Sequence, residues 1–96
     1  MRYRQLGRSG LLVSEVCLGA MSFGAVGYWE KIGGLDQHAA QRLVDTALDA
    51  GVNFFDTADV YSYGQSEEIL GKAIGSRRDQ VVLATKVRGR MSPEIN

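Results

Sequence analysis

The chain has little of what disulfide and metal sites require. It contains a single cysteine, Cys17, and a single histidine, His38, which excludes an internal disulfide and leaves no metal site to be recognised. Cys17 lies in a short apolar run, which favours a small buried side chain over a reactive thiol. His38 falls in the first turn of an expected helix, where an exposed polar residue without a catalytic role is the simpler interpretation.

The sequence also lacks an excess of charge and a long apolar run. Lys plus Arg and Asp plus Glu number 11 each, so no strong field exists to attract nucleic acid or an anionic membrane. No apolar run approaches the roughly 7–15 residues of a signal-peptide core or the roughly 20 of a spanning helix. With 45% hydrophobic and 23% charged residues, we expect a globular cytoplasmic protein that binds neither nucleic acid nor membranes. The sequence does not indicate the oligomeric state.

The first third of the chain reads as short extended runs. Residues 2–6 and 11–14 flank the loop Gly7-Arg8-Ser9-Gly10, a pattern typical of a β-hairpin. Residues 16–19 form a short apolar run that predicts a strand. The glycines between Gly24 and Gly34 then predict a loop.

Two helical patterns follow, each leading into a strand. Apolar residues recur at i, i+3, i+4, i+7 and i+8 from Ala40, which predicts a helix that Asp36 can cap and Gly51 can end. The remaining expected elements are a strand over residues 52–55, a helix that begins at Ser66 and ends at Gly75, and a strand over residues 81–86.

The spacing of these strands predicts the fold class. They end near Leu18, Phe55 and Lys86, close to the roughly 31 residues per unit of a 250-residue eight-fold barrel. We therefore expect an α/β fold, the N-terminal part of a (β/α)8 TIM barrel with a β-hairpin and about three βα units, and residues 1–96 as the N-terminal portion of a single barrel domain. Three parallel strands would leave unpaired edges and an uncovered inner face, so we expect the barrel to be incomplete. Residues 92–94, Ser-Pro-Glu, resemble the start of a third helix.

Two glycines invite a nucleotide-binding motif, but the match fails. Gly19 and Gly24 have the outer spacing of a phosphate-binding P-loop, yet Ala25 and Val26 stand where that motif needs Lys and Ser or Thr. No Gly-x-Gly-x-x-Gly follows the first strand either. These glycines are explained by a sharp exit from strand to loop.

Three polar residues lie where a parallel barrel places its chemistry. Asp56 and Lys86 each close an apolar strand, at the end where active sites of such barrels form. Because side chains alternate and adjacent strands run about 4.8 Å apart, the two can meet at the barrel mouth. Tyr61 follows Asp56 by five residues and can bend over both.

Two interpretations of this trio stay open from spacing alone. Asp56 and Lys86 can form a structural ion pair, with Tyr61 only packing nearby. Alternatively, an ammonium held by a carboxylate favours the phenolate of a neighbouring tyrosine, which then serves as an acid–base group. Such a group can protonate a carbonyl oxygen while a hydride arrives at its carbon.

The segment from Gly51 to Tyr61, Gly-Val-Asn-Phe-Phe-Asp-Thr-Ala-Asp-Val-Tyr, resembles the signature of the aldo-keto reductase family. The resemblance spans nearly the whole chain, and the branch it resembles includes bacterial general-stress-type reductases and potassium-channel β subunits. The other matching segments are residues 4–7, 11–14, 18–24, 64–67 and 84–86.

The resemblance implies a role for each member of the trio. Tyr61 would be the general acid, Lys86 would lower its pKa, and Asp56 would pair with Lys86. The cofactor would be NADPH, with Gly19, Ala20 and Met21 near the nicotinamide and Asp56 near its ribose. Tyr28 and Trp29 fall in a loop that lines the substrate pocket in relatives, although aromatic cover over the barrel mouth explains them equally well.

The resemblance also implies parts that lie beyond Asn96. These are a histidine that helps orient the carbonyl and the segments that hold the adenine and the 2′-phosphate. We therefore expect an NADPH-dependent reductase of aldehydes or ketones as the parent protein, with a small-molecule carbonyl substrate, and expect these 96 residues alone to be inactive. The alternative is a truncated, non-catalytic fragment or a regulatory subunit that binds NADP or a partner. The natural substrate and the preference for NADPH over NADH are not predicted.

Overall fold

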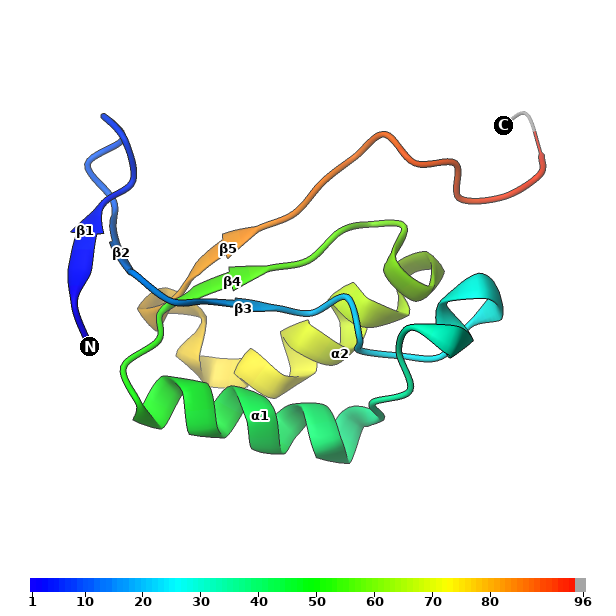
Figure 1. Ribbon diagram of the computed structural model, residues 1–96, viewed down its shortest axis with the longest axis horizontal. Coiled ribbons are helices and arrows are strands. Elements are labelled where there is room, and N and C mark those ends of the chain that lie inside the picture. Colours follow the sequence, from blue (N-terminus) through cyan, green and yellow to red (C-terminus); the bar gives the residue numbers. More distant parts are fainter. Residues whose placement is uncertain (95–96) are drawn as a thin grey trace.

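The computed structural model describes residues 1–94, which form a hairpin, a parallel sheet and two α-helices (Figure 1). The hairpin pairs β1 (Tyr3–Gln5) with β2 (Leu12–Ser14). The parallel sheet has the strand order β3-β4-β5, with β3 at Cys17–Gly19, β4 at Phe54–Asp56 and β5 at Val82–Ala84. The α-helices are α1 (Gln37–Asp49) and α2 (Gln65–Ile74), and the 3-10 helices are η1 (Gly27–Lys31), η2 (Tyr61–Gly64) and η3 (Gly75–Gln80).

Helix α1 begins and ends where the sequence predicts. The backbone N–H of Ala39 donates to Asp36 Oδ1 at 2.9 Å, a cap of the kind worth about 1 kcal/mol. Gly51 follows the helix with a φ of 92°, a left-handed conformation that glycine adopts without strain. Ala40 and Val44 are fully buried, whereas Leu43, which belongs to the same predicted apolar stripe, is 42% exposed at the outer side of the helix.

Both helices lie on one face of the parallel sheet and build the core (Figure 1). Phe55 points from β4 toward the helices and is completely buried. Leu18 and Leu83 pair with Phe55 in register on the neighbouring strands, so their side chains lie on the same face of the sheet and pack against the same cluster. Helix α2 contributes Ile69, Leu70, Ala73 and Ile74 to this core.

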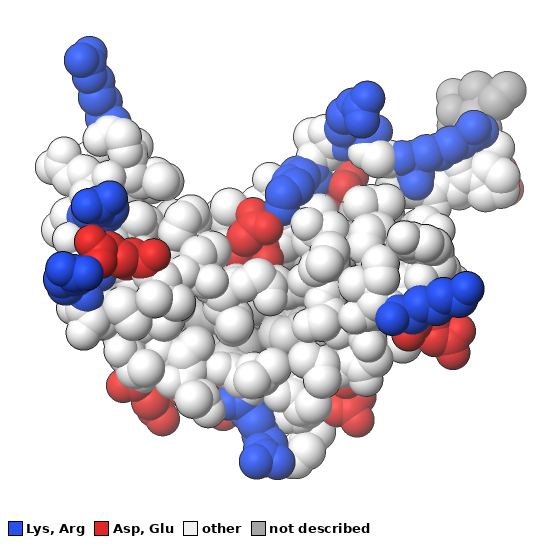
Figure 2. Space-filling model, in the orientation of Figure 1, with Lys and Arg blue, Asp and Glu red and all other residues white. Residues whose placement is uncertain are grey.

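The other face of the sheet is open within residues 1–94, and this corrects the prediction for Cys17. The thiol is exposed rather than buried, because Leu18 takes the side that the helices cover and Cys17 takes the opposite side. Partial burial and, to a lesser extent, the negative charge of Asp56 raise the pKa of this thiol above its ordinary value. Figure 2 shows this edge of the molecule hollowed between the hairpin and the C-terminal segment.

The N-terminal hairpin is confirmed and lies at the start of the strands, opposite the end that Asp56 closes (Figure 1). Asn53 joins it to β4: its Oδ1 accepts from the backbone N–H of Ser14 at 2.7 Å, and its Nδ2 donates to the Leu12 carbonyl at 3.0 Å. The Tyr3 hydroxyl donates to the Gly51 carbonyl at 2.6 Å. These bonds fix the hairpin against the end of α1 and the start of β4.

Several segments differ from the sequence-based prediction: the strand expected over residues 52–55 is β4 at Phe54–Asp56, and the strand expected over residues 81–86 is the shorter β5 at Val82–Ala84. The loop from Gly24 to Gly34 contains the 3-10 helix η1, and α2 begins at Gln65, one residue before Ser66. Residues 92–94 form bends instead of a helical turn, and the Arg90 guanidinium donates to the carbonyl oxygens of Ser92 and Pro93. The rest of that predicted helix, residues 95–96, lies outside the described residues.

No helix within residues 1–94 is long and apolar enough to cross a bilayer. On the face shown in Figure 2, acidic and basic side chains are interspersed and gather into no broad patch of one sign.

Candidate functional site

Asp56 and Lys86 meet at the C-terminal edge of the parallel sheet, as predicted, but Lys86 does not close its strand, because β5 ends two residues earlier, at Ala84. Lys86 Nζ donates to Asp56 Oδ2 at 2.5 Å and to the Thr57 carbonyl at 2.8 Å. In the parallel register Asp56 lies beside Ala84, so Lys86, two residues farther, shares its face. The ammonium is therefore held between a carboxylate and a backbone carbonyl.

The backbone keeps Lys86 in this place beyond the end of β5. The N–H of Thr57 donates to the Ala84 carbonyl at 2.9 Å, and the N–H of Asp59 donates to the Lys86 carbonyl at 3.3 Å, which extends the ladder past both strands. The hydrogen bond to Asp56 raises the pKa of Lys86 above its ordinary value, and Tyr61 adds to this, whereas partial burial opposes it. Lys86 therefore carries its charge throughout the neutral pH range.

Tyr61 lies between the ammonium and an aromatic ring. Its ring centroid is 5.2 Å from Lys86 Nζ, within range of a cation–π contact. On another side, the rings of Tyr61 and Trp29 meet edge-to-face, with centroids 5.2 Å apart and an angle of 65°. The structure thus brings Asp56, Tyr61 and Lys86 together and adds Trp29 to them.

The turn after Tyr61 adopts an unusual backbone conformation. Ser62 and Tyr63 have φ values of 49° and 51°, in the left-handed region, which costs on the order of 1–3 kcal/mol for each such residue. Ser62 is buried, and its hydroxyl oxygen accepts from the backbone N–H of Val26 at 3.5 Å. Sequence reasoning missed this turn, because neither Ser nor Tyr indicates a positive φ.

A buried hydroxyl pair connects the strand ends to α2. Ser66 Oγ donates to the Ala20 carbonyl at 2.7 Å and lies 2.9 Å from Thr57 Oγ1. The N–H of Ala20 in turn donates to the Asp56 carbonyl at 2.8 Å. The side chains of Ala20, Thr57 and Ser66 are all buried, so the start of α2 holds the ends of β3 and β4. Sequence reasoning assigned no role to Thr57 and used Ser66 only as a helix start.

The predicted cofactor-binding residues divide into two groups. Gly19 is exposed next to Asp56, and a Cβ added to it would meet no atom within 4 Å, so the strand end is open there. Met21 is 44% exposed. The Ala20 side chain instead lies in the core, and its N–H and carbonyl are both engaged within the chain. The structure therefore brings Gly19 and Asp56, but not the Ala20 side chain, to one open surface.

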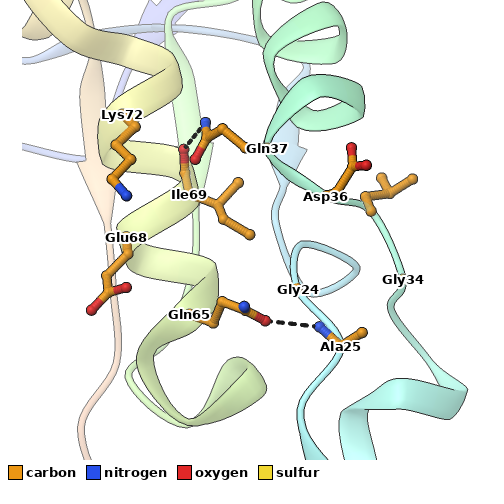
Figure 3. Close-up of a pocket in the computed structure, with 10 residues that line it drawn as sticks. Gly24, Ala25, Gly34, Asp36, Gln37, Gln65, Glu68, Ile69 and Lys72 are labelled. Carbon is orange, nitrogen blue, oxygen red and sulfur yellow. Dashed lines mark hydrogen bonds between the residues drawn. The ribbon is translucent and has the colours of Figure 1, made fainter.

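The structure also has a cavity, but its described residues hold no group of metal ligands. A cavity of about 330 Å³ opens between the starts of α1 and α2, lined by Asp36, Gln65, Lys72 and neighbouring residues (Figure 3). Within residues 1–94, no three His, Cys, Asp or Glu side chains are grouped to hold a metal ion.

Sequence comparisons place this geometry among known proteins. The family model described as the aldo/keto reductase family matches residues 15–95. An oxidoreductase of Bacillus subtilis (strain 168), YrpG, is 47% identical over 94 residues, covering 91% of this chain and 26% of that protein. A protein of Oryza sativa subsp. japonica, named as a probable voltage-gated potassium channel subunit beta, is 46% identical over 91 residues, covering 91% of this chain and 25% of that protein. The chain thus spans about a quarter of the length of the curated relatives it matches.

Solved structures agree with the sequence relatives. The holo form of an aldo-keto reductase from Bacillus halodurans matches with a TM-score of 0.76 at 44% identity, covering 91% of this chain and 26% of that one. The apo form of the same enzyme matches with a TM-score of 0.61 at 45% identity, covering 91% and 27%. The chain belongs to the aldo/keto reductase family, and its fold is that of the N-terminal part of the family's (β/α)8 barrel.

Proposed function

We propose that the protein carrying this segment is an NADPH-dependent reductase that converts aldehydes or ketones to alcohols. One observation carries the proposal: Lys86 Nζ bridges Asp56 Oδ2 and the Thr57 carbonyl while lying 5.2 Å from the Tyr61 ring centroid. Carbonyl reduction needs a proton at the oxygen and a hydride at the carbon. The bound nicotinamide supplies the hydride.

In this proposal Tyr61 donates its phenolic proton to the carbonyl oxygen. The ammonium of Lys86 stabilises the phenolate that remains, and Asp56 keeps the ammonium charged and oriented. The edge-to-face contact with Trp29 covers one side of the Tyr61 ring, and in this proposal it reduces the access of water to the phenol.

The strand ends are suited to a flat cofactor ring. Gly19 leaves open space beside Asp56, and within residues 1–94 Asp56 engages Lys86 through Oδ2, which leaves Oδ1 to accept from a ribose hydroxyl.

The similarity to a potassium channel β subunit favours a second candidate. In that case the parent protein is a regulatory subunit that binds NADP and a partner protein. The two candidates differ in turnover: an enzyme consumes many equivalents of NADPH, whereas a regulatory subunit binds one equivalent and releases little product.

The test uses the full-length protein, NADPH and the reactive substrate para-nitrobenzaldehyde. We expect steady consumption of NADPH by the wild type and a fall in kcat of about 10²–10⁴-fold in Tyr61→Phe, with NADPH affinity nearly unchanged. Tyr63→Phe is the matched control, because this tyrosine is two residues away and 43% exposed, and it should keep wild-type turnover.

Two results would contradict the proposal. Tight NADPH binding by the wild type without turnover of any aldehyde or ketone would favour the regulatory subunit. A Tyr61→Phe variant with the turnover of the wild type would show that another group is the acid.

A further inference from the structure

The loop that carries Trp29 is closed at its base by backbone hydrogen bonds. We call residues 24–34 the aromatic loop. The N–H of Gly24 donates to the Leu35 carbonyl at 2.8 Å, and the N–H of Gly34 donates to the Gly24 carbonyl at 2.9 Å. These bonds join the two ends of the loop, but neither of them contacts the segment that carries Tyr61.

A side chain from α2 supplies that missing contact. Gln65 Oε1 accepts from the backbone N–H of Ala25 at 2.9 Å, a bond visible in Figure 3. The loop backbone is pressed against this amide, because a Cβ added to Gly24 would lie 2.5 Å from the same oxygen. Gly24 also has a φ of 89°, so glycine is required here by conformation as well as by space.

The contact from Gln65 is reinforced by the turn that follows Tyr61. The buried Ser62 accepts from the N–H of Val26 at 3.5 Å, and its Cβ would lie 3.0 Å from a Cβ on Gly24. Ser62 and Gln65 both come from the segment directly after Tyr61. The aromatic loop is therefore anchored to the same short stretch of chain that presents the phenol.

We propose that Gln65 is a positioning residue that sets the shape of the carbonyl pocket, an inference that rests on the proposed reductase function. By holding Ala25, it keeps Trp29 edge-on to Tyr61, with centroids 5.2 Å apart. A large substituent on the substrate carbonyl must then fit beside a fixed indole ring. A small substituent does not reach it.

Hydrogen bonds inside the loop explain how an anchor at Ala25 acts on Trp29. The N–H of Trp29 donates to the Val26 carbonyl at 3.2 Å, and the Trp29 carbonyl accepts from the N–H of Gly33 at 2.6 Å, so the turn around Trp29 is tied to the residue next to Ala25. Trp29 itself follows Ala25 by only four residues. Loss of the bond at Ala25 is therefore transmitted to the indole.

The test compares two variants of Gln65 in the full-length protein. Gln65→Met keeps the length and bulk of the side chain but removes the acceptor, whereas Gln65→Glu restores an acceptor oxygen. Gln41→Met is the control, because Gln41 donates to the Ala73 carbonyl between α1 and α2 and does not touch the aromatic loop.

The structural readout does not depend on activity. In Gln65→Met the Ala25 amide should exchange its hydrogen about two- to tenfold faster, and the nuclear Overhauser contact between the Trp29 and Tyr61 rings should weaken. Both should return to wild-type values in Gln65→Glu and remain unchanged in Gln41→Met.

The kinetic readout compares a bulky aromatic aldehyde with propanal. In Gln65→Met we expect KM for the aromatic aldehyde to rise about two- to tenfold with kcat within about twofold, and both constants for propanal to stay the same. Unchanged Ala25 exchange, an intact Trp29–Tyr61 contact, or equal KM changes for both aldehydes would contradict the positioning role. A wild-type protein that reduces neither aldehyde would instead contradict the proposed function, while exchange and ring contact would still decide whether Gln65 positions the loop.

Discussion

The two faces of the parallel sheet carry different kinds of side chains. The face covered by α1 and α2 presents Leu18, Phe55 and Leu83 to a closed apolar core. The opposite face, open within residues 1–94, presents Asp56 and leads at its strand ends to Lys86 and Tyr61. The alternation of a strand therefore separates stability from chemistry, so that a change on one face should alter folding and a change on the other should alter turnover.

The largest expected effect concerns the open face as a whole. We expect residues 1–96 expressed alone to show no measurable NADPH-dependent reduction of para-nitrobenzaldehyde, whereas the full-length protein is active. Holding cofactor and carbonyl in contact contributes about 7–11 kcal/mol to such reactions, and these residues leave one side of the site uncovered. Absorbance of NADPH measures the rate, and turnover by residues 1–96 at a tenth or more of the full-length rate would show that the site needs no further surface.

Much of this division was predictable from the sequence. The helical spacing of apolar residues from Ala40 predicted α1. Parallel strands with alternating side chains predicted that Asp56 and Lys86 would meet. These features depend on local pattern and regular geometry, which a sequence displays directly. The exposure of Cys17 was mispredicted because an apolar run does not say which face of a strand is covered.

The contacts around Tyr61 were not predictable in the same way. Ser62 has a left-handed backbone that its residue type does not indicate. The contact of Gln65 with the loop depends on Ala25, 40 residues away in the chain, meeting Gln65 in space. A polar residue at a helix start has many ordinary explanations, so its residue type alone does not indicate a tertiary contact. Only the packing of the aromatic loop against η2 and the start of α2 shows that Gln65 makes such a contact.

On the covered face, Phe55→Ala in the full-length protein should have the largest effect on folding. The ring is fully buried, so its removal should lower the free energy of unfolding by about 3–5 kcal/mol. Leu43→Ala, at an apolar position that is 42% exposed, should cost less than about 1 kcal/mol. Urea denaturation followed by circular dichroism measures both, and equal losses would contradict the division between buried and exposed positions.

Ser66→Ala tests the buried hydrogen bonds by which the start of α2 holds the strand ends near the site. It leaves the buried Ala20 carbonyl and Thr57 hydroxyl without their partner, which should cost about 1–3 kcal/mol in the full-length protein. Because the strand ends move with these groups, turnover should also fall. Ser76→Ala, at an exposed serine of η3, is the control. A loss of turnover without any loss of stability would place Ser66 at the reacting groups instead of in the supporting network.

The smallest expected effect is the pH dependence of the ion pair at the strand ends. The hydrogen bond to Asp56 raises the pKa of Lys86, so the folded state holds the lysine proton more tightly than the unfolded chain does. The resulting stability is fully present below the ordinary lysine pKa of about 10.4 and is lost as the pH rises through the higher value of the folded state. Asp56→Asn removes it, and because the lysine side chain is half-exposed, solvent screening keeps the effect small. Melting temperatures of the wild type and of Asp56→Asn should therefore differ slightly at neutral pH and converge as the pH rises through the raised pKa of Lys86 in the folded state. A difference that grows with rising pH would show that the pair opposes folding.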